Sequence, residues 1–255
     1  MKRPWKDRLY AAYVSSGQAE DSHLEPATHF APRRPYIQRV IRQHISSNRN
    51  CRILDLGCGH GAFLYFLQQA GYQDIHGVDV SAEQVAMAHR FGITNVDRQD
   101  ITFYLNNVED ETVDIVLLMD ILEHLTRQEL FDMLDDVFRI MRPGGKCVIH
   151  VPNASGVYGM HVRYGDLTHE LAFTPQSAQQ AFSTVGFEYI QCFEDKPVIH
   201  GPISIVRWLL WNLGTWPTKL LLAAETGGKA FILSQNMLIT AVKPEPTADS
   251  KRNLW

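Results

Sequence analysis

The sequence has few of the features that mark metal-binding, secreted or membrane-spanning proteins. Its 255 residues contain four cysteines, none of them in a C-x-x-C pair, so a redox dithiol or a cysteine metal site is not indicated. No run of about 18 consecutive apolar residues occurs, and residues 1–8 lack the apolar core of a secretory signal. We therefore expect a reduced, cytoplasmic protein for which no metal is required.

A basic surplus is also missing. The chain has 24 Lys and Arg against 28 Asp and Glu, which gives a net charge of −4 with histidine neutral. Duplex nucleic acid is normally bound by a basic surface, so it is not an expected partner. The 45% hydrophobic and 20% charged residues are typical of a globular protein, and the length predicts one to two domains.

Residues 51–152 alternate short apolar runs with longer amphipathic ones. This rhythm predicts βαβ units and a parallel sheet with helices on both faces. The expected strands cover 52–56, 75–79, 113–119 and 146–151, and the expected helices cover 62–69, a segment capped by Ser81, and 128–141.

Additions are expected at both ends of this core. Residues 1–47 form an N-terminal arm with an amphipathic helix, and residues 48–255 form the main domain. Within that domain, Thr174 and Pro175 indicate the start of a helix that ends near Gly186. Two strands over 187–193 and 231–242 can then pair as an antiparallel edge.

A glycine loop with the sequence D-L-G-C-G-H-G lies between the first strand and the following helix. Dinucleotide folds use G-x-G-x-x-G to place a pyrophosphate on a helix N-terminus. This loop instead has G-x-G-x-G, in Gly57, Gly59 and Gly61, with Asp55 at the end of the strand itself. A carboxylate at that place repels phosphate and can hold an ammonium group. The ligand is therefore expected to be cationic at this end.

Two further acids end the next two strands. Asp79 lies about 20 residues beyond the loop, where a carboxylate accepts hydrogen bonds from ribose hydroxyls. Asp100 can accept a hydrogen bond from the exocyclic amino group of adenine. Ammonium, ribose and adenine together describe S-adenosylmethionine better than a nicotinamide cofactor. The alternative for each acid is a structural one, in which the carboxylate caps the next helix.

These residues resemble the motifs of class I S-adenosylmethionine-dependent methyltransferases. Residues 55–61 match D-x-G-x-G-x-G, residues 78–81 match the second acidic position, and residues 119–125 (M-D-I-L-E-H-L) are similar to a segment of ubiquinone-biosynthesis-type members. Residues 169–177 and 185–187 resemble the His…Phe-Thr-Pro-x-Ser…Gly-Phe pattern of methyltransferase family 23.

The resemblance implies a Rossmann-like, mostly parallel seven-stranded sheet with helices on both faces, an antiparallel edge strand and a helical insert near the C-terminus. It implies S-adenosylmethionine as the cofactor and S-adenosylhomocysteine as the product. The cofactor-binding residues that it implies are Asp55, Gly57, Cys58, Gly59, Gly61, Asp79, Val80, Asp100, Ile101, Met119 and Asp120. Cys58 is interpreted as a small residue tolerated between two glycines.

Methyl transfer from a sulfonium is an in-line displacement in which alignment supplies much of the acceleration. A hydroxyl acceptor also needs a base, and histidine suits this role at neutral pH. His124 and His169 are the candidates. His124 follows the strand that borders the cofactor and could face the methyl group, and His169 lies in a polar loop expected at the mouth of the crevice. A helix-capping role is the alternative for His124. His150, within a strand, is interpreted first as a core histidine.

Residues 203–225 are rich in Trp and Leu but are interrupted by Gly214 and Pro217. We expect a helical cap over the substrate crevice or a homodimer face. The alternative is peripheral contact with a membrane and a lipid-linked acceptor, because tryptophans flanked by Arg207 and Lys219 are typical of interfacial helices. The arm resembles a segment that closes over the cofactor in related enzymes. The arm contains Tyr10, Tyr13, His29, Arg33 and Arg34, to which the resemblance assigns no individual roles. The alternative is a solvated basic arm.

The sequence thus predicts an S-adenosylmethionine-dependent methyltransferase that acts on the oxygen of a small-molecule or glycan-type acceptor. Two alternatives remain open. One is a methyltransferase acting on protein or RNA, and the other is a module that binds the cofactor without catalysis.

Overall fold

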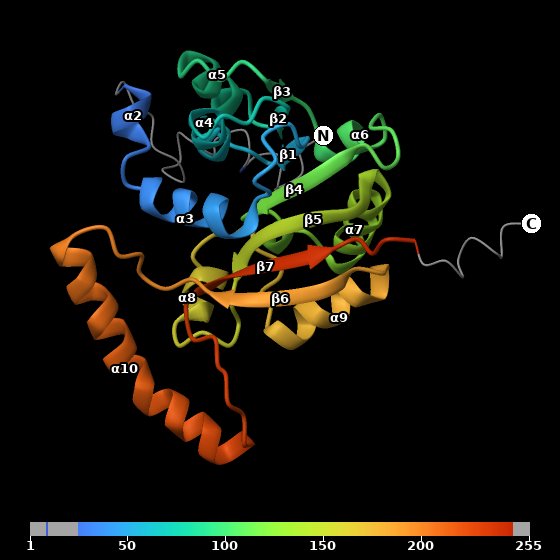
Figure 1. Cartoon of the computed structure of the whole chain (residues 1–255). Helices are drawn as coiled ribbons and strands as arrows, with labels where there is room; N and C mark the ends of the chain where they lie inside the picture. Colours follow the sequence, from blue (N-terminus) through green and yellow to red (C-terminus); the bar gives the residue numbers. More distant parts are fainter. Residues whose placement is uncertain (1–8, 10–24, 247–255) are drawn as a thin grey trace, which may run out of the picture.

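One seven-stranded sheet organises the molecule, in the strand order β3-β2-β1-β4-β5-β7-β6 (Figure 1). The computed structural model describes residue 9 and residues 25–246. The strands are β1 (Ile53–Leu56), β2 (Ile75–Asp79), β3 (Val96–Arg98), β4 (Val113–Met119), β5 (Met141–Pro152), β6 (Glu188–Glu194) and β7 (Asn236–Val242). β7 runs antiparallel to both of its neighbours, and the pairs from β3 to β5 are parallel. The expected mostly parallel sheet with an antiparallel pair at its edge is confirmed.

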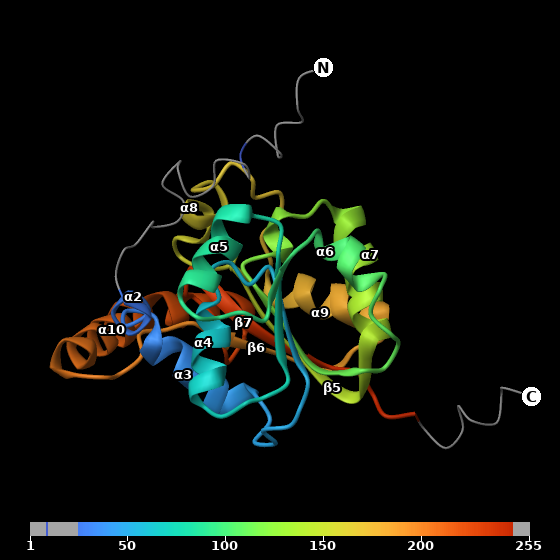
Figure 2. The same ribbon diagram turned by 90° about the horizontal axis from the view of Figure 1, so that it is seen from above.

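Helices cover both faces of the sheet (Figure 2). On one face lie α3 (Arg34–His44), α4 (Ala62–Gln69) and α5 (Ala82–Arg90), and on the other lie α6 (Ile101–Leu105), α7 (Arg127–Ile140) and α9 (Pro175–Val185). The remaining helices are α2 (Pro26–His29), the short 3₁₀ helix Leu122–His124, α8 (Gly159–Arg163) and α10 (Pro202–Thr226).

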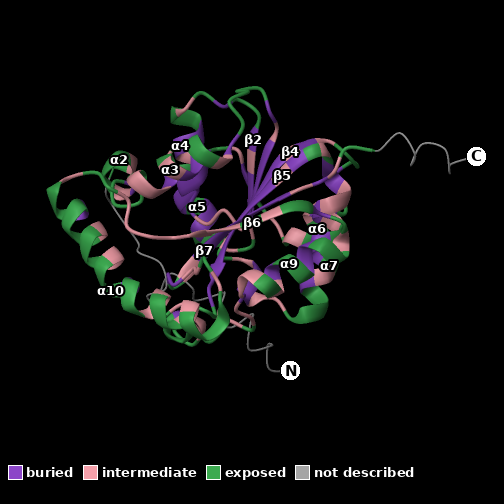
Figure 3. Ribbon diagram, turned by 60° about the horizontal axis from the view of Figure 1, so that its bottom comes forward, coloured by how far each residue is buried: buried purple, intermediate pink, exposed green. Residues whose placement is uncertain are grey.

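The strands are apolar on both sides because each face of the sheet has its own core (Figure 3). In β1 every residue is buried. Leu54 and Leu56 belong to the hydrophobic cluster that contains Val137 of α7 and Phe182 of α9, whereas Ile53 belongs to the cluster on the opposite face. This alternation is what a strand covered by helices on both faces requires.

Several helix boundaries agree with the sequence signals. The Ser81 hydroxyl accepts a hydrogen bond from the backbone N–H of Gln84 and caps α5. Thr174 forms a capping box with Ser177 at the start of α9, and Gly186 ends that helix with φ +111°. Local capping chemistry therefore determined these boundaries.

Two strand boundaries differ from expectation. β5 begins at Met141 rather than Lys146. Met141 already pairs with Val113 of β4, and the register between the two strands then shifts so that Lys146 pairs with Ile115. β7 begins at Asn236 rather than residue 231. The side-chain amide of Asn153 donates to the carbonyls of Ile232 and Ser234, so these carbonyls bond a side chain instead of a neighbouring strand.

The apolar insert forms a single 25-residue helix, α10, which continues through Gly214 and Pro217. The expected interruption is therefore absent. α10 runs along the outside of the molecule, at the end remote from α6 and α7 (Figure 1). Among the described residues, no helix combines the length and the apolar character needed to cross a bilayer.

Candidate functional site

The glycine loop turns sharply between β1 and α4. Gly57, Gly59 and Gly61 all have positive φ, between +55° and +82°, a backbone region that favours glycine. A Cβ on Gly57 would lie 2.0 Å from Cδ1 of Ile121. The backbone N–H of Gly57 donates to the Val78 carbonyl at 2.7 Å, which joins the loop to β2. The loop is thus fixed at the carboxyl ends of the first two strands.

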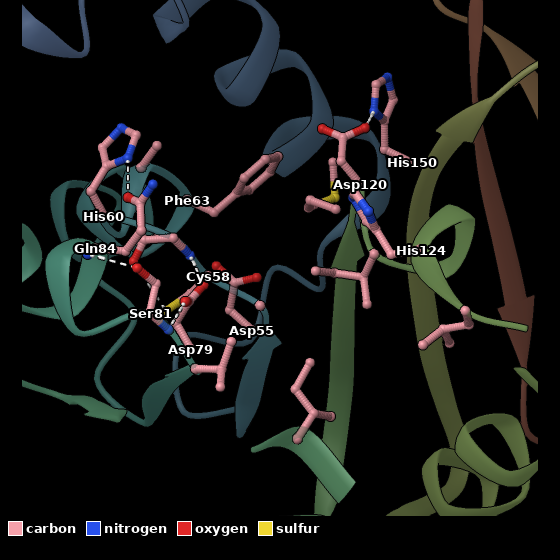
Figure 4. A pocket seen from close by; sticks show the side chains of 18 of the residues that line it. Asp55, Cys58, His60, Phe63, Asp79, Ser81, Gln84, Asp120, His124 and His150 are labelled. Atoms are coloured by element: carbon pink, nitrogen blue, oxygen red, sulfur yellow. Dashed lines mark hydrogen bonds and ion pairs between the residues drawn. The ribbon is translucent and has the colours of Figure 1, made fainter. Parts of the chain in front are cut away.

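Asp79 is held against this loop by backbone donors (Figure 4). Its Oδ2 accepts from the N–H of Gly59 at 2.8 Å, and its Oδ1 accepts from the N–H of Ser81 at 2.8 Å. Burial raises the pKa of Asp79, and these two hydrogen bonds oppose that increase. Because each carboxylate oxygen has a further lone pair, Asp79 can still accept hydrogen bonds from a ligand.

Asp55 is the most unusual group at the site. The residue is 2% exposed, and its Oδ1 has no hydrogen-bond partner in the described structure. Burial, and secondarily the charge of Asp79, raise the pKa of Asp55 to about 7. A buried, unpartnered carboxyl is costly unless a donor or a cation satisfies it. Its position beside the glycine loop therefore fits an ammonium group of a bound ligand.

These residues open into a cavity of about 990 Å³. Ten of the eleven cofactor-binding residues expected from the resemblance line it, namely Asp55, Gly57, Cys58, Gly59, Asp79, Val80, Asp100, Ile101, Met119 and Asp120. The eleventh, Gly61, is outside the lining. Asp100 also caps α6, because its Oδ1 accepts from the N–H of Phe103 at 3.1 Å. The structural and ligand-binding interpretations of Asp100 are thus compatible.

Cys58 lies in the same lining but is poorly suited to be a nucleophile. Burial, followed by the charges of Asp55 and Asp79, raises the pKa of the Cys58 thiol well above its usual range. A thiol in that state carries little of the reactive thiolate. The interpretation of Cys58 as a small packing residue is consistent with this environment.

The arm also lines the cavity, through Pro32 and Arg33 just before α3 and through Tyr36 and Ile37 within α3. Arg33 offers a positive charge to the cavity. The Tyr36 hydroxyl is buried without a partner in the described structure. Of the other arm residues named from the sequence, Tyr10 and Tyr13 lie outside the described residues, and His29 and Arg34 are not in the lining.

His150 is a buried, hydrogen-bonded histidine, as its place in a strand suggested, but the sequence did not indicate its two carboxylate partners. Its Nδ1 lies 2.5 Å from Oδ1 of Asp120, and its Nε2 lies 3.3 Å from Oδ2 of Asp195. Burial acts to lower the pKa of His150, but the charges and hydrogen bonds of the two carboxylates together raise it to about 10. Asp195 also pairs with Arg39 of α3 at 2.8 Å. This chain of ion pairs links the arm to the cavity wall.

His124 and His169 come together although 45 positions separate them. Their ring centroids are 4.7 Å apart, and His124 lines the cavity whereas His169 does not. Nδ1 of His124 lies 2.8 Å from the Thr168 hydroxyl, which donates to Asp166 at 2.7 Å. Nδ1 of His169 lies 3.0 Å from the Val162 carbonyl. Each Nδ1 therefore acts as the donor in these hydrogen bonds.

His124 is uncharged at neutral pH. Burial, and then the neighbouring His169, lower the pKa of His124 to about 4. Glu123 beside it is also buried, and its Oε2 has no partner in the described structure. One ligand atom from each of Glu123, His124 and His169 lies within 4.8 Å of the others, so this group could hold a divalent cation.

The expected crevice cap is not found at this cavity. No residue of α10 contributes to its lining. Among residues 25–246 the walls come from the ends of β1, β2, β4 and β5, from the segments after β1 to β4 and after β6, and from α3 to α7 with the turn before α3. In the described arrangement α10 therefore does not cover the cavity. The apolar character of residues 203–225 needs a different explanation.

Comparison with known families identifies this architecture. The model of methyltransferase family 23, described as a methyltransferase domain, matches residues 28–192, which is more than half of the chain. The chain therefore belongs to methyltransferase family 23, whose cofactor is S-adenosylmethionine, as the resemblance of the motifs implied.

Curated relatives agree with the family and differ in their acceptors. The chain is 28% identical over 148 residues to O-methyltransferase rstn1 of Aspergillus nomiae, covering 55% of this chain and 63% of that protein. It is 25% identical over 186 residues to tRNA U34 carboxymethyltransferase of Hydrogenovibrio crunogenus, covering 68% and 55%. It is 32% identical over 100 residues to ubiquinone biosynthesis O-methyltransferase of Sinorhizobium fredii, covering 38% and 39%. The chain thus spans less than two thirds of each of these relatives.

Solved structures share the fold. A S-adenosylmethionine-dependent methyltransferase from Archaeoglobus fulgidus has a TM-score of 0.62 at 22% identity, covering 93% of this chain and 99% of that one. The putative methyltransferase from Haloferax volcanii, solved in complex with the Trm112 activator, has a TM-score of 0.62 at 16% identity, covering 92% and 98%. At such identities the likeness establishes the fold.

Proposed function

We propose that this chain transfers a methyl group from S-adenosylmethionine to a hydroxyl oxygen of a small-molecule or glycan-type acceptor, including a lipid-linked one. The observation that carries the proposal is the buried Asp55 carboxyl, unpartnered at Oδ1 in the described structure, beside the glycine loop. A cationic amino-acid group satisfies this carboxyl, whereas a pyrophosphate does not. The O-methyltransferases among the relatives support an oxygen acceptor.

The residues of the cavity fit the parts of the cofactor in order. Asp55 would hold the ammonium group, Asp79 the ribose hydroxyls, and Asp100 with Ile101 the adenine. When bound, the cofactor supplies a methyl group on a positively charged sulfur. The protein's contribution is to fix the cofactor in the cavity, to exclude water with α3, and to align the acceptor, which can supply several kcal/mol of the barrier.

His124 is positioned to take the proton of the acceptor hydroxyl. It lines the cavity, and its low pKa leaves Nε2 uncharged at neutral pH. Thr168 and Asp166 orient the ring through Nδ1. His169, outside the lining but against the same ring, would contact the acceptor or orient His124. General-base catalysis of this kind typically contributes about 10²–10⁴-fold.

Titration calorimetry with S-adenosylmethionine tests the cofactor site. Asp79→Ala should abolish tight binding because the ribose loses its acceptor. Asp97→Ala is the matched control, since Asp97 lies on the adjacent strand β3 outside the cavity lining. Unchanged affinity in Asp79→Ala would overturn the ribose assignment.

An assay with labelled cofactor tests the reaction. Extracts of the source cell are divided into four fractions: small molecules, glycans with lipids, proteins, and RNA. The methylated product is identified by mass spectrometry. Label in the small-molecule fraction or in the fraction of glycans and lipids is the expected result. Label in protein or RNA would move the acceptor to that class, and cofactor binding without any turnover would make the chain a binding module.

A further inference from the structure

The proposed methyl transfer does not use α10. Eight large apolar side chains of this helix point outward and are each between 47% and 79% exposed. We call them the outward face; they are Ile203, Val206, Leu209, Leu210, Leu213, Trp216, Leu220 and Leu221. Figure 3 shows how much of α10 is exposed. A helix on the surface of a globular protein normally keeps its apolar residues towards the core. α10 half-buries Trp208 and Trp211 but leaves the outward face exposed as well.

The polar groups of α10 lie on its other side. Ser204 and Thr215 are buried, and Nζ of Lys219 lies 3.3 Å from Oε2 of Glu194 at the end of β6. Ser204 and Thr215 are about three helical turns apart, and Thr215 and Lys219 are about one turn apart, so all three lie on the same side of the helix. The Lys219–Glu194 pair joins this side of α10 to the domain. The Ser204 hydroxyl bonds the backbone of Gly201 at the start of the helix, and the Thr215 hydroxyl donates to the Trp211 carbonyl within it.

The outward face is wide and carries no charge. At about 100° per residue its eight members span an arc of about 140°. The ionisable residues of α10 are Arg207, Lys219 and Glu225, and none of them falls within this arc. An uncharged arc of this width, with a tryptophan in it, is the form that lets a helix lie in a membrane interface with its apolar side immersed.

A second copy of the chain fits the same face less well. A helix of 25 residues is about 37 Å long, and a face about 10 Å wide then offers roughly 370 Å². A specific protein interface usually buries about 800 Å² on each partner. α10 lies at one end of the molecule (Figure 1), so this helix alone supplies about half of the surface that a stable dimer needs.

We propose that the outward face of α10 lies in the surface of a lipid bilayer and attaches the protein to it peripherally. The ligand is the bilayer surface itself. The apolar side chains of the outward face lie at the boundary between headgroups and acyl chains, and Arg207 lies among the headgroups. The proposal does not depend on which acceptor the cavity takes.

Vesicle flotation of the full chain tests the attachment. The probe is phosphatidylcholine vesicles with and without phosphatidylglycerol, and the wild-type protein should float with both. Leu213→Glu/Leu220→Glu should lower the bound fraction by about tenfold or more, because two charges enter the apolar arc. The matched control is Phe103→Glu/Tyr189→Glu, which adds the same charges at exposed sites on α6 and β6.

Two further measurements keep the result interpretable. S-adenosylmethionine affinity and thermal unfolding should be the same in the α10 variant as in the wild type, which shows that the domain still folds. A blue shift of tryptophan emission on vesicle addition should be reduced in Trp216→Phe. The proposal is overturned if the wild type stays with the lipid-free fraction, if the α10 variant floats as well as the wild type, or if light scattering shows a dimer that Leu213→Glu/Leu220→Glu dissociates.

Discussion

Asp55→Asn is the substitution that examines the site most directly. The carboxyl is buried beside the glycine loop, and its pKa is raised to about 7 by burial first and by the charge of Asp79 second. Asparagine has nearly the same shape but does not titrate. Comparing the two proteins over pH therefore isolates the titration of this one group from the rest of the chain.

The sign and size follow from proton linkage. In the unfolded chain the pKa of aspartate is about 3.9. Between that value and about 7, folded Asp55 keeps a proton that the unfolded chain has lost, so this group's contribution to the free energy of unfolding decreases as pH rises. At about 1.4 kcal/mol for each pH unit, roughly 3 kcal/mol is lost between about pH 5 and pH 8, and little further above that.

Urea unfolding of the cofactor-free protein at a series of pH values measures this loss. The stability difference between wild type and Asp55→Asn should shift by about 3 kcal/mol in favour of the variant between about pH 5 and pH 8. Asp135→Asn is the control, because Asp135 is exposed and outside the cavity lining. If wild type and Asp55→Asn keep parallel profiles, Asp55 is not a buried titrating carboxyl and the argument fails.

Two other substitutions examine the base and the loop. His124→Ala should lower turnover by about 10²–10⁴-fold while cofactor affinity stays unchanged, and a chelator should leave the wild-type rate as it is. Unaltered turnover in both His124→Ala and His169→Ala would leave positioning alone as the mechanism. A chelator-sensitive rate would assign a metal to the cluster of Glu123, His124 and His169. Gly57→Ala should destabilise the fold by more than the roughly 1–2 kcal/mol expected for a left-handed backbone, because its Cβ meets Ile121 at 2.0 Å. Gly92→Ala is the control, since it has φ +79° and no neighbour within 4 Å, and equal unfolding midpoints for the two variants would contradict the clash.

Much of the core was predictable because its signals are local. β4 occupies the expected residues 113–119, and Thr174 with Pro175 begins α9 as expected. The glycine loop and the acids at strand ends indicated the cofactor crevice, because parallel strands bring their carboxyl ends to one edge of the sheet. Hydrophobic periodicity, helix caps and turns each depend on a few neighbouring residues, so they can be recognised in the sequence alone.

The rest depended on contacts between distant parts of the chain. His150 looks like any strand residue until Asp195, 45 positions later, and Asp120 enclose it. His124 and His169 were separate candidates until the loop after β5 brought their rings to 4.7 Å. The apolar residues of 203–225 indicated burial or an interface, but not the direction in which they point.

Motif spacing was thus enough for the class of fold, the family's cofactor and the acids that line the cavity, because close spacing along the chain carries that information. Tertiary structure decided which histidines share a cavity, which carboxylates are left buried beside the glycine loop, and that α10 directs its apolar face outward. Those outcomes depend on how elements far apart in sequence pack, and packing brings together charges and surfaces that no local pattern relates.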